Sequence, residues 1–211
     1  MQPNLKAAMA LLDLHFECFH AVEPYALRTQ HPAPSDTRGW SQVLVSTITG
    51  VNGLARKKGP DLCDGSDVKA ANTWTAIDTP RFNGAIKAGT KAASSGSMAS
   101  LDAMPYLYFV LWDETVRQTS RCRIWAVRTQ HDQTFRSMCK QWYAKCATGE
   151  ISSSNFQLHP PRGKDSNELR NTCGNLEYPL LFSAERAAGG KYQLTSYEPT
   201  VLDTGACTLL P

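Results

Sequence analysis

The chain has 211 residues, and 42% of them are hydrophobic, which is enough to bury a core and argues against wholesale disorder. Charged residues make up only 19%, with 22 Lys and Arg against 19 Asp and Glu, so the formal net charge is +3. This mildly basic balance excludes a polybasic, histone-like binder. It permits a nucleic-acid partner without indicating one.

Neither a membrane span nor an export signal is predicted. No stretch approaches the roughly 20 consecutive apolar residues that a membrane span needs. At the start of the chain Asp13, His15 and Glu17 interrupt the apolar run that a signal peptide requires. We therefore expect a cytoplasmic protein with reduced thiols. The seven cysteines contain no CxxC pair, so a disulfide framework or a zinc knuckle is disfavoured.

Helical periodicity dominates the first quarter of the chain. Apolar residues at helical spacing predict an amphipathic helix over about residues 4–22, ended by Pro24. A Pro-rich connector follows, and a second helix is predicted over about residues 40–48, stopped by Gly50. We expect this N-terminal helical part to occupy about residues 1–55.

The remaining sequence, about residues 56–211, reads as a hairpin and a sheet. An Asp64-Gly65 turn lies between two short extended stretches, which predicts a hairpin, and residues 88–100 are small and polar, as in a loop. Residues 106–112 and 121–128 are predicted strands, the first buried on both faces. Asp132 is expected to cap a helix that ends at Gly149. Shorter strands are expected at 156–159 and 179–183, and a turn at Asp113-Glu114.

This order of elements predicts a mixed α/β layered domain. We expect one domain over residues 1–211, with a central mixed β-sheet flanked by helices.

The residues most suggestive of chemistry are Pro60-Asp61 followed by Asp67-Val68-Lys69. Hydrolysis of a phosphodiester needs a divalent cation that offsets the charge of the phosphate and lowers the pKa of an attacking water. Mg²⁺ prefers oxygen ligands and usually takes one or two carboxylates. A nearby ammonium can orient the water and stabilise the developing negative charge. Two carboxylates and a lysine on one face therefore form a coherent set.

The turn decides whether these side chains share a face. Asp67 and Lys69 do so as alternate residues of a strand. A two-residue Asp64-Gly65 turn would leave Asp61 on the opposite face. A three-residue loop, with Gly65 in the left-handed region, would place Asp61 directly opposite Asp67. We predict the three-residue loop, with Val68 pointing into the core and its carbonyl oxygen still available to a metal.

A Pro-Asp pair followed by Asp-x-Lys on adjacent strands resembles the motif of the PD-(D/E)xK nuclease superfamily, and especially of its type II restriction endonucleases. Residues 58–72, with Pro80-Arg81-Phe82-Asn83 shortly after, are similar to small restriction enzymes of the MamI group. The pattern covers under a tenth of the chain, but the order of elements around it also suits the central sheet and flanking helices of that family.

The resemblance implies roles for the residues. Asp61, Asp67 and the carbonyl of Val68 would hold Mg²⁺, and Lys69 would activate water. Only five residues separate Asp61 from Asp67, at the short end for the family, so Asp64 remains the alternative first ligand. The resemblance also implies cleavage of double-stranded DNA to 5′-phosphate ends by a homodimer in a prokaryotic cytoplasm. A cognate DNA methyltransferase is expected in the same system.

Several polar residues outside the acidic site are candidates for DNA contact, although an ordinary solvated loop would have a similar composition. Arg and Lys pair with phosphates and guanine, and Asn pairs with adenine. The candidates are Arg56, Lys57, Lys58, Arg81, Asn83, Arg162, Lys164, Asn167 and Arg170.

Two other functions stay open at the level of sequence. One is a structure-selective repair nuclease or junction resolvase, and the other is a non-catalytic DNA-binding protein whose hairpin acids are simply solvated. The chain has no HxxxH arrangement, no GxGxxG and no GxxxxGK[ST], so zinc hydrolases and nucleotide-binding enzymes are disfavoured.

Overall fold

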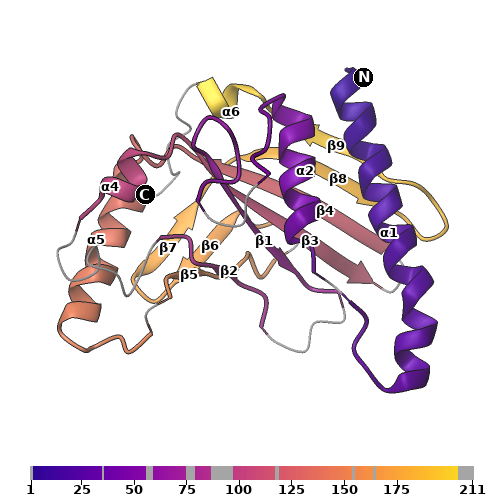
Figure 1. Ribbon diagram of the computed structural model, residues 1–211, viewed down its shortest axis with the longest axis horizontal. Coiled ribbons are helices and arrows are strands. Elements are labelled where there is room, and N and C mark those ends of the chain that lie inside the picture. Colours follow the sequence, from indigo (N-terminus) through magenta and orange to yellow (C-terminus); the bar gives the residue numbers. More distant parts are fainter. Residues whose placement is uncertain are drawn as a thin grey trace.

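A five-stranded mixed sheet forms the centre of the molecule (Figure 1). The computed structural model describes residues 2–34, 36–55, 59–74, 79–86, 97–116, 119–153, 155–163 and 165–203. The strand order is β1-β3-β4-β8-β9, with β1 parallel to β3 and the other pairs antiparallel. The strands are β1 (Asp67–Asn72), β3 (Leu107–Val116), β4 (Thr119–Val127), β8 (Leu180–Arg186) and β9 (Gln193–Tyr197).

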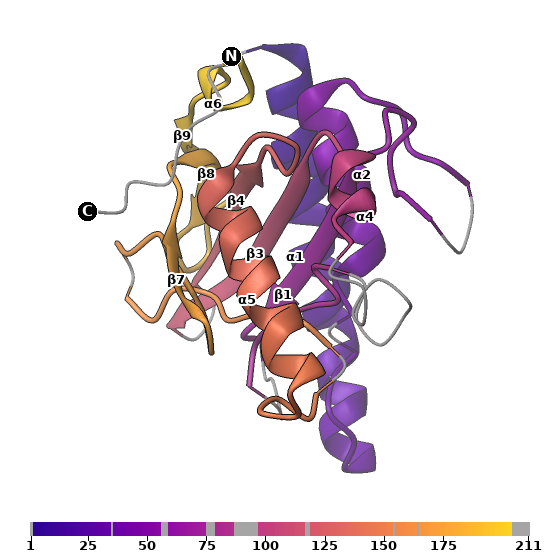
Figure 2. The same cartoon turned by 90° about the vertical axis from the view of Figure 1, so that its left-hand side faces the viewer.

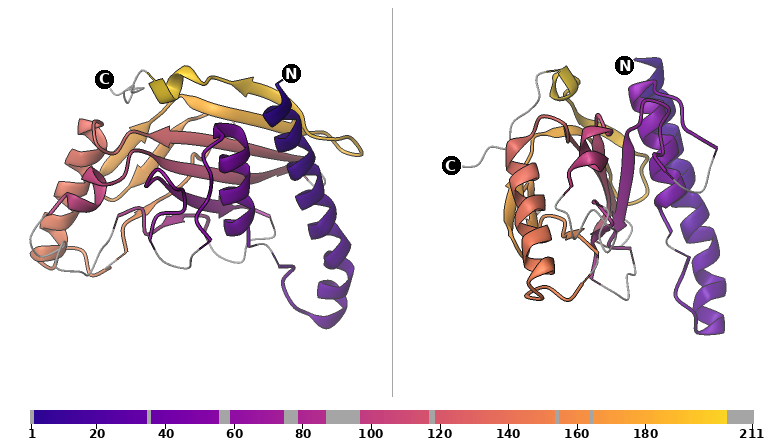
Figure 3. Two further views of the ribbon diagram at one scale, coloured as in Figure 1. Left: turned by 45° about the horizontal axis from the view of Figure 1, so that its top comes forward. Right: turned by 60° about the vertical axis from the view of Figure 1, so that its left-hand side comes forward.

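Two helices cover one face of this sheet. α1 (Pro3–Thr29) and α2 (Arg38–Thr49) lie side by side, as the right-hand view of Figure 3 shows. Their apolar residues share one buried core with strand residues such as Val68, Val110 and Ile124. The side chains of β1 that alternate with Val68 therefore point to the opposite face.

The opposite face carries a second core and a more varied cover. α5 (Gln133–Ala147) lies across it, as Figure 2 shows. Its apolar side shares a buried core with Phe109, Leu111 and Trp125 of the sheet. The smaller elements are α4 (Ala99–Asp102), α6 (Thr200–Asp203), the pair β2 (Phe82–Asn83) and β5 (Gln157–Leu158), and the pair β6 (Glu168–Asn171) and β7 (Gly174–Glu177). The predicted central mixed sheet flanked by helices is confirmed.

The first helix is longer than predicted. It continues through Pro24 to Thr29 and ends at Gln30 in the left-handed conformation. Proline removes one intrahelical hydrogen bond, but packing beyond it can maintain the helix. Here Ala26 is buried in the first core, and the end of α1 extends past the sheet in Figure 1. No helix among the described residues is both long and apolar enough to cross a membrane.

Other local predictions have mixed outcomes. The second helix, the two main strands and the Asp132 cap are confirmed, and Asp132 Oδ1 accepts a hydrogen bond from the Phe135 amide. The turn at Asp113-Glu114 is wrong, because both residues continue β3 and pair with β4. In the predicted loop at 88–100, residues 88–96 lie outside the described residues, and residues 99 and 100 begin α4.

The predicted hairpin forms only its turn. Gly65 has φ +96° and its amide donates to the Leu62 carbonyl at 3.1 Å, which agrees with the three-residue loop. Residues 60–62 do not continue as a strand paired with β1. Leu62 instead forms an antiparallel bridge with Gly53, and the Leu54 amide donates to the Asp61 carbonyl at 2.8 Å. The Asp61 and Leu62 amides both donate to the Ser66 carbonyl at 3.1 Å, so pairing across the turn stops before β1 begins.

Candidate active site

β1 presents Asp67 and Lys69 on the face opposite Val68. The Lys69 ammonium lies 2.6 Å from Asp67 Oδ2, and the two side chains are 19% and 18% exposed. Val68 points into the first core and is 4% exposed. The alternation predicted for Asp67-Val68-Lys69 is confirmed. It leaves an acid and an amine in contact at the edge strand of the sheet.

Asp61 reaches the same place from the preceding turn. Its Oδ2 accepts the Val68 amide at 3.0 Å, and Asp67 Oδ1 accepts that same amide at 2.9 Å. Gln42 of α2 donates to Asp61 Oδ1 at 2.7 Å. The two carboxylates therefore converge on one backbone N–H, although Asp61 does not stand in a strand opposite Asp67 as predicted.

The convergence of two acids separates their pKa values. Burial, and next the Asp67 carboxylate, raises the pKa of Asp61 from 3.8 to about 6. Burial acts in the same direction on Asp67, but the contacts with Asp61 and with the Lys69 ammonium outweigh it and hold the pKa of Asp67 below its usual value. Crowded carboxylates of this kind are stabilised by a bound cation.

The donor set fits a hard divalent ion. Mg²⁺ needs only one or two carboxylates, because phosphate oxygens and water complete its coordination. Asp61 and Asp67 would supply two carboxylates to such an ion, and Val68, between Asp67 and Lys69, would supply its backbone carbonyl. Among the described residues, no three His, Cys, Asp or Glu side chains are grouped so that they could hold a metal ion.

A cavity of about 440 Å³ opens over these residues. Its lining includes the exposed Arg38 at the start of α2, Asn83 of β2 and Gly84, which follows β2. Asp61, Asp67, Val68 and Lys69 line it together. The sequence does not predict that Gln42 and Arg38 belong to the site, because α2 reaches the site only through tertiary packing.

Asp64 takes a different part in the local structure. Its two carboxylate oxygens accept the amide and the hydroxyl of Ser66 at 2.8 and 3.0 Å, and its side chain is not among those lining the cavity. Of the two acids that the sequence left open, Asp61 is therefore the one that the fold brings to Asp67.

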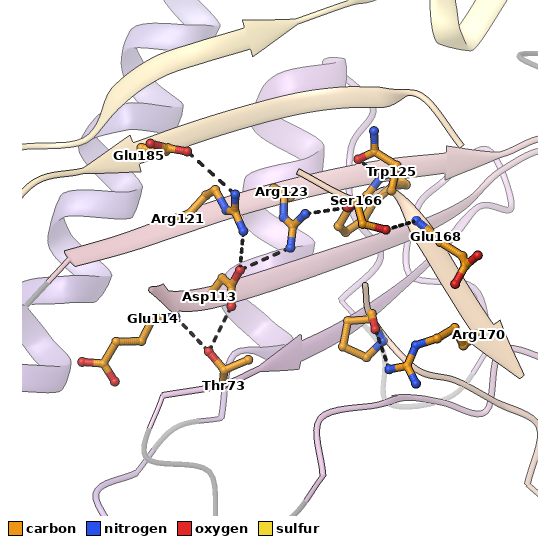
Figure 4. A network of polar contacts seen from close by, with 12 residues as sticks. Thr73, Asp113, Glu114, Arg121, Arg123, Trp125, Ser166, Glu168, Arg170 and Glu185 are labelled. Atoms are coloured by element: carbon orange, nitrogen blue, oxygen red, sulfur yellow. Dashed lines mark hydrogen bonds and ion pairs between the residues drawn. The ribbon is translucent and has the colours of Figure 1, made fainter. Parts of the chain in front are cut away.

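A network of buried charged side chains around Asp113 lies on the same face of the sheet, at the far end of β1 (Figure 4). Asp113 Oδ2 accepts from Arg121 at 2.7 Å and from Arg123 at 3.2 Å, and Thr73 donates to Asp113 Oδ1 at 3.2 Å. Burial, and next the neighbouring Arg121, lowers the pKa of Arg123 to about 10. This network joins the ends of β1, β3 and β4 and stabilises the sheet beside the cavity.

The DNA-contact candidates are scattered by the fold. Asn83 lines the cavity, Arg81 lies two residues before it on the same segment, and Arg162 is exposed and not among the lining residues. Asn167 accepts from the Trp125 indole at 3.2 Å, and Arg170 donates to the Pro160 carbonyl at 3.0 Å, so both support the local fold. The remaining candidates, Arg56, Lys57, Lys58 and Lys164, lie outside the described residues.

A mixed sheet flanked by helices, with two acids and a lysine at its edge strand, has the architecture of the restriction-endonuclease-like enzymes. The chain matches the family model of the MamI restriction endonuclease over residues 24–190. It is 31% identical over 176 residues to the type II restriction enzyme MamI of Microbacterium ammoniaphilum. The chain belongs to the MamI restriction endonuclease family, as the sequence resemblance predicted.

The alignment with that enzyme covers 77% of this chain and 56% of the relative, so the chain spans little more than half of the relative's length. No solved structure shows a significant match to the chain.

Proposed function

We propose that this protein is a type II restriction endonuclease that hydrolyses phosphodiester bonds of double-stranded DNA at a specific site, in a Mg²⁺-dependent reaction. The observation that carries the proposal is the convergence of Asp61 and Asp67 on the Val68 amide, with the Lys69 ammonium 2.6 Å from Asp67. Membership of the MamI family supports the same activity.

Each residue of the cluster has a distinct part in this reaction. Asp61, Asp67 and the Val68 carbonyl would hold the ion, which when bound offsets the charge of the phosphate and lowers the pKa of water. Lys69 orients the attacking water and stabilises the negative charge that develops on the phosphate oxygens. Water attacks phosphorus in line and the bond to the 3′ oxygen breaks, which leaves a 5′-phosphate end. Gln42 holds the Asp61 carboxylate in position through its hydrogen bond to Oδ1.

DNA would enter along the walls of the cavity. Arg38 and Asn83 are exposed side chains that line the cavity, where they can meet phosphates and bases next to the cut. Because the protein as a whole carries only +3, its affinity for DNA depends on such local contacts and should fall as salt rises.

Membership of the family also supports a proposal for the domain, the assembly and the cellular setting. We propose that residues 1–211 act as one nuclease domain, because α1 and α2 pack on the sheet that carries the acids. A homodimer would cut both strands of a symmetric site. A cognate methyltransferase would protect the host DNA, and both enzymes would work in a prokaryotic cytoplasm.

The Lys69→Ala variant tests the assignment. We expect it to bind the same DNA fragments as the wild type while its cleavage rate falls about 10²- to 10⁴-fold, because only the proton-handling and charge-stabilising group is lost. Lys140→Ala, at an exposed position of α5, is the matched control and should cleave normally. Cleavage by Lys69→Ala at the wild-type rate would contradict the mechanism. Smeared rather than discrete products from the wild type would indicate a nuclease of another specificity.

A further inference from the structure

A short antiparallel ribbon beside the cavity projects two amide side chains outward. β2 pairs with β5 so that Phe82 lies opposite Leu158 and Asn83 opposite Gln157. Phe82 and Leu158 are fully buried in the second core. Since successive side chains of a strand point to opposite faces, Asn83 and Gln157 project together from the outer face of the ribbon.

Hydrogen bonds fix the orientation of these amides. Asn83 Oδ1 accepts from Asn155 Nδ2 at 3.2 Å and from Gln157 Nε2 at 2.9 Å. Asn155 in turn accepts the Gly84 amide at 2.8 Å through its own oxygen. Two groups are left over: the Asn83 Nδ2 donor and the Gln157 Oε1 acceptor have no hydrogen-bond partner among the described residues.

This donor and acceptor stand next to the candidate active site. Asn83 and Gly84 line the same cavity as Asp67 and Lys69. DNA with a phosphate at the acids would therefore bring base edges close to the ribbon. A two-stranded ribbon is also one of the shapes that the major groove admits.

The chemistry of the pair favours one base. In the major groove adenine is the one base that presents an acceptor, N7, and a donor, N6, together, whereas guanine presents two acceptors and cytosine a single donor. A protein surface with one donor and one acceptor therefore complements adenine. A surface that reads guanine would need donors at both positions, as Arg supplies.

On the basis of the function proposed above, we propose that Asn83 and Gln157 form a base-reading pair that selects an A·T base pair at a fixed position close to the cut. Asn155 is a positioning residue, because it holds the Asn83 side chain and the Gly84 backbone and uses both ends of its amide to do so.

Asn83→Asp is the most selective variant for a test. It keeps the oxygen that accepts from Asn155 and Gln157, and it replaces the outward Nδ2 donor with a second acceptor. The added negative charge lowers the affinity for every sequence alike, so the readout must be the sequence selected rather than the affinity. Asn175→Asp is the matched control, since Asn175 is an exposed amide on the other ribbon, β6–β7, and does not line the cavity.

The experiment selects duplexes from a randomised DNA pool with each protein, with Ca²⁺ in place of Mg²⁺ so that bound DNA stays intact. The wild type should enrich a motif that contains an A·T pair at one position. Asn83→Asp should lose preference at that position by about 5- to 150-fold and keep the rest of the motif. Asn175→Asp should select the complete wild-type motif.

Three results would overturn the base-reading assignment: an unchanged motif with Asn83→Asp, a G·C pair at the affected position, or no enriched motif with the wild type. Incubation of the selected duplexes with wild-type protein and Mg²⁺ is scored separately. A motif that depends on Asn83 but is not cut contradicts the nuclease function alone, whereas a motif that is cut but does not depend on Asn83 contradicts only the inference.

Discussion

Asp61 and Asp64 lie three residues apart in one turn, and their side chains make different contacts. Asp61 meets Asp67 at the Val68 amide, while Asp64 accepts both hydrogen bonds of Ser66 and closes the turn. The sequence predicted Asp67 and Lys69 securely, because alternation along a strand places them on one face. It left Asp61 and Asp64 open, because a turn of uncertain length carries no such rule.

These two acids give a direct test at the residue scale. Asp61→Asn should reduce Mg²⁺-dependent cleavage by at least about 10²-fold, because one of the two carboxylate ligands loses its charge. Asp64→Asn should leave the cleavage rate within a few-fold of the wild type and lower the stability of the turn by about 1 kcal/mol. Cleavage rates at saturating DNA and thermal melts measure both effects. The reverse pattern would make Asp64 the metal ligand.

His15 of α1 is a buried histidine that makes the stability of the fold depend on pH. Its ring lies 4.2 Å from the Trp112 ring, between centroids, and is 4% exposed. Burial lowers the pKa of His15 from 6.5 to about 4. The folded protein thus keeps the ring neutral while the unfolded chain takes up a proton, so the stability is complete above pH 6.5 and is lost as the pH falls toward 4.

His15→Phe keeps the aromatic volume and removes the titration. Between pH 7 and pH 4 the wild type should lose about 3 kcal/mol more of its unfolding free energy than this variant does. Urea unfolding at a series of pH values measures the difference. His131→Phe, at an exposed position, is the control and should follow the wild type. Parallel curves for wild type and His15→Phe would contradict the prediction.

At the scale of elements, regular segments were predictable and connections were not. The Asp132 cap and the apolar face of α5 are local signals, and both hold. The strand preceding β1 does not form: Leu62 forms a bridge with Gly53, and the Asp61 and Leu62 amides both donate to the Ser66 carbonyl. The helix passes Pro24 because packing of Ala26 beyond it overrides a local stop signal. In each failure a contact that lies outside the local pattern overrides it.

The Asp113 network links the ends of β1, β3 and β4 and should contribute to the stability of the sheet. Asp113 forms ion pairs with two guanidiniums, those of Arg121 and Arg123, whose side chains are 5% and 3% exposed. Asp113→Asn should destabilise the protein by about 3–5 kcal/mol, because it leaves two buried cations without their shared carboxylate. Glu185→Gln removes a half-exposed carboxylate 3.9 Å from Arg121 and should cost under about 1 kcal/mol. Equal losses of unfolding free energy in the two variants would contradict this account of the network.

At the scale of the whole molecule, the sheet brings together residues that the sequence keeps apart. The strand order β1-β3-β4-β8-β9 places α1 and α2 on one face and leaves Asp67 and Lys69 on the other, beside β2. The sequence predicted the class of the fold and the acidic cluster. It did not predict the contact of Gln42 with Asp61, Arg38 in the cavity lining or the pairing of Gln157 with Asn83, because these depend on pairing and packing between segments far apart in the chain.

We propose that Asp61, Asp67 and Lys69 form the active site of a restriction endonuclease. The most direct measurement is incubation of wild-type protein and Asp67→Asn with phage DNA, each with Mg²⁺ and with EDTA, read on a gel. We predict discrete fragments from the wild type with Mg²⁺ only, and intact DNA in the other three reactions. Fragments that persist in EDTA or with Asp67→Asn, or intact wild-type reactions across several DNA substrates and divalent ions, would contradict it.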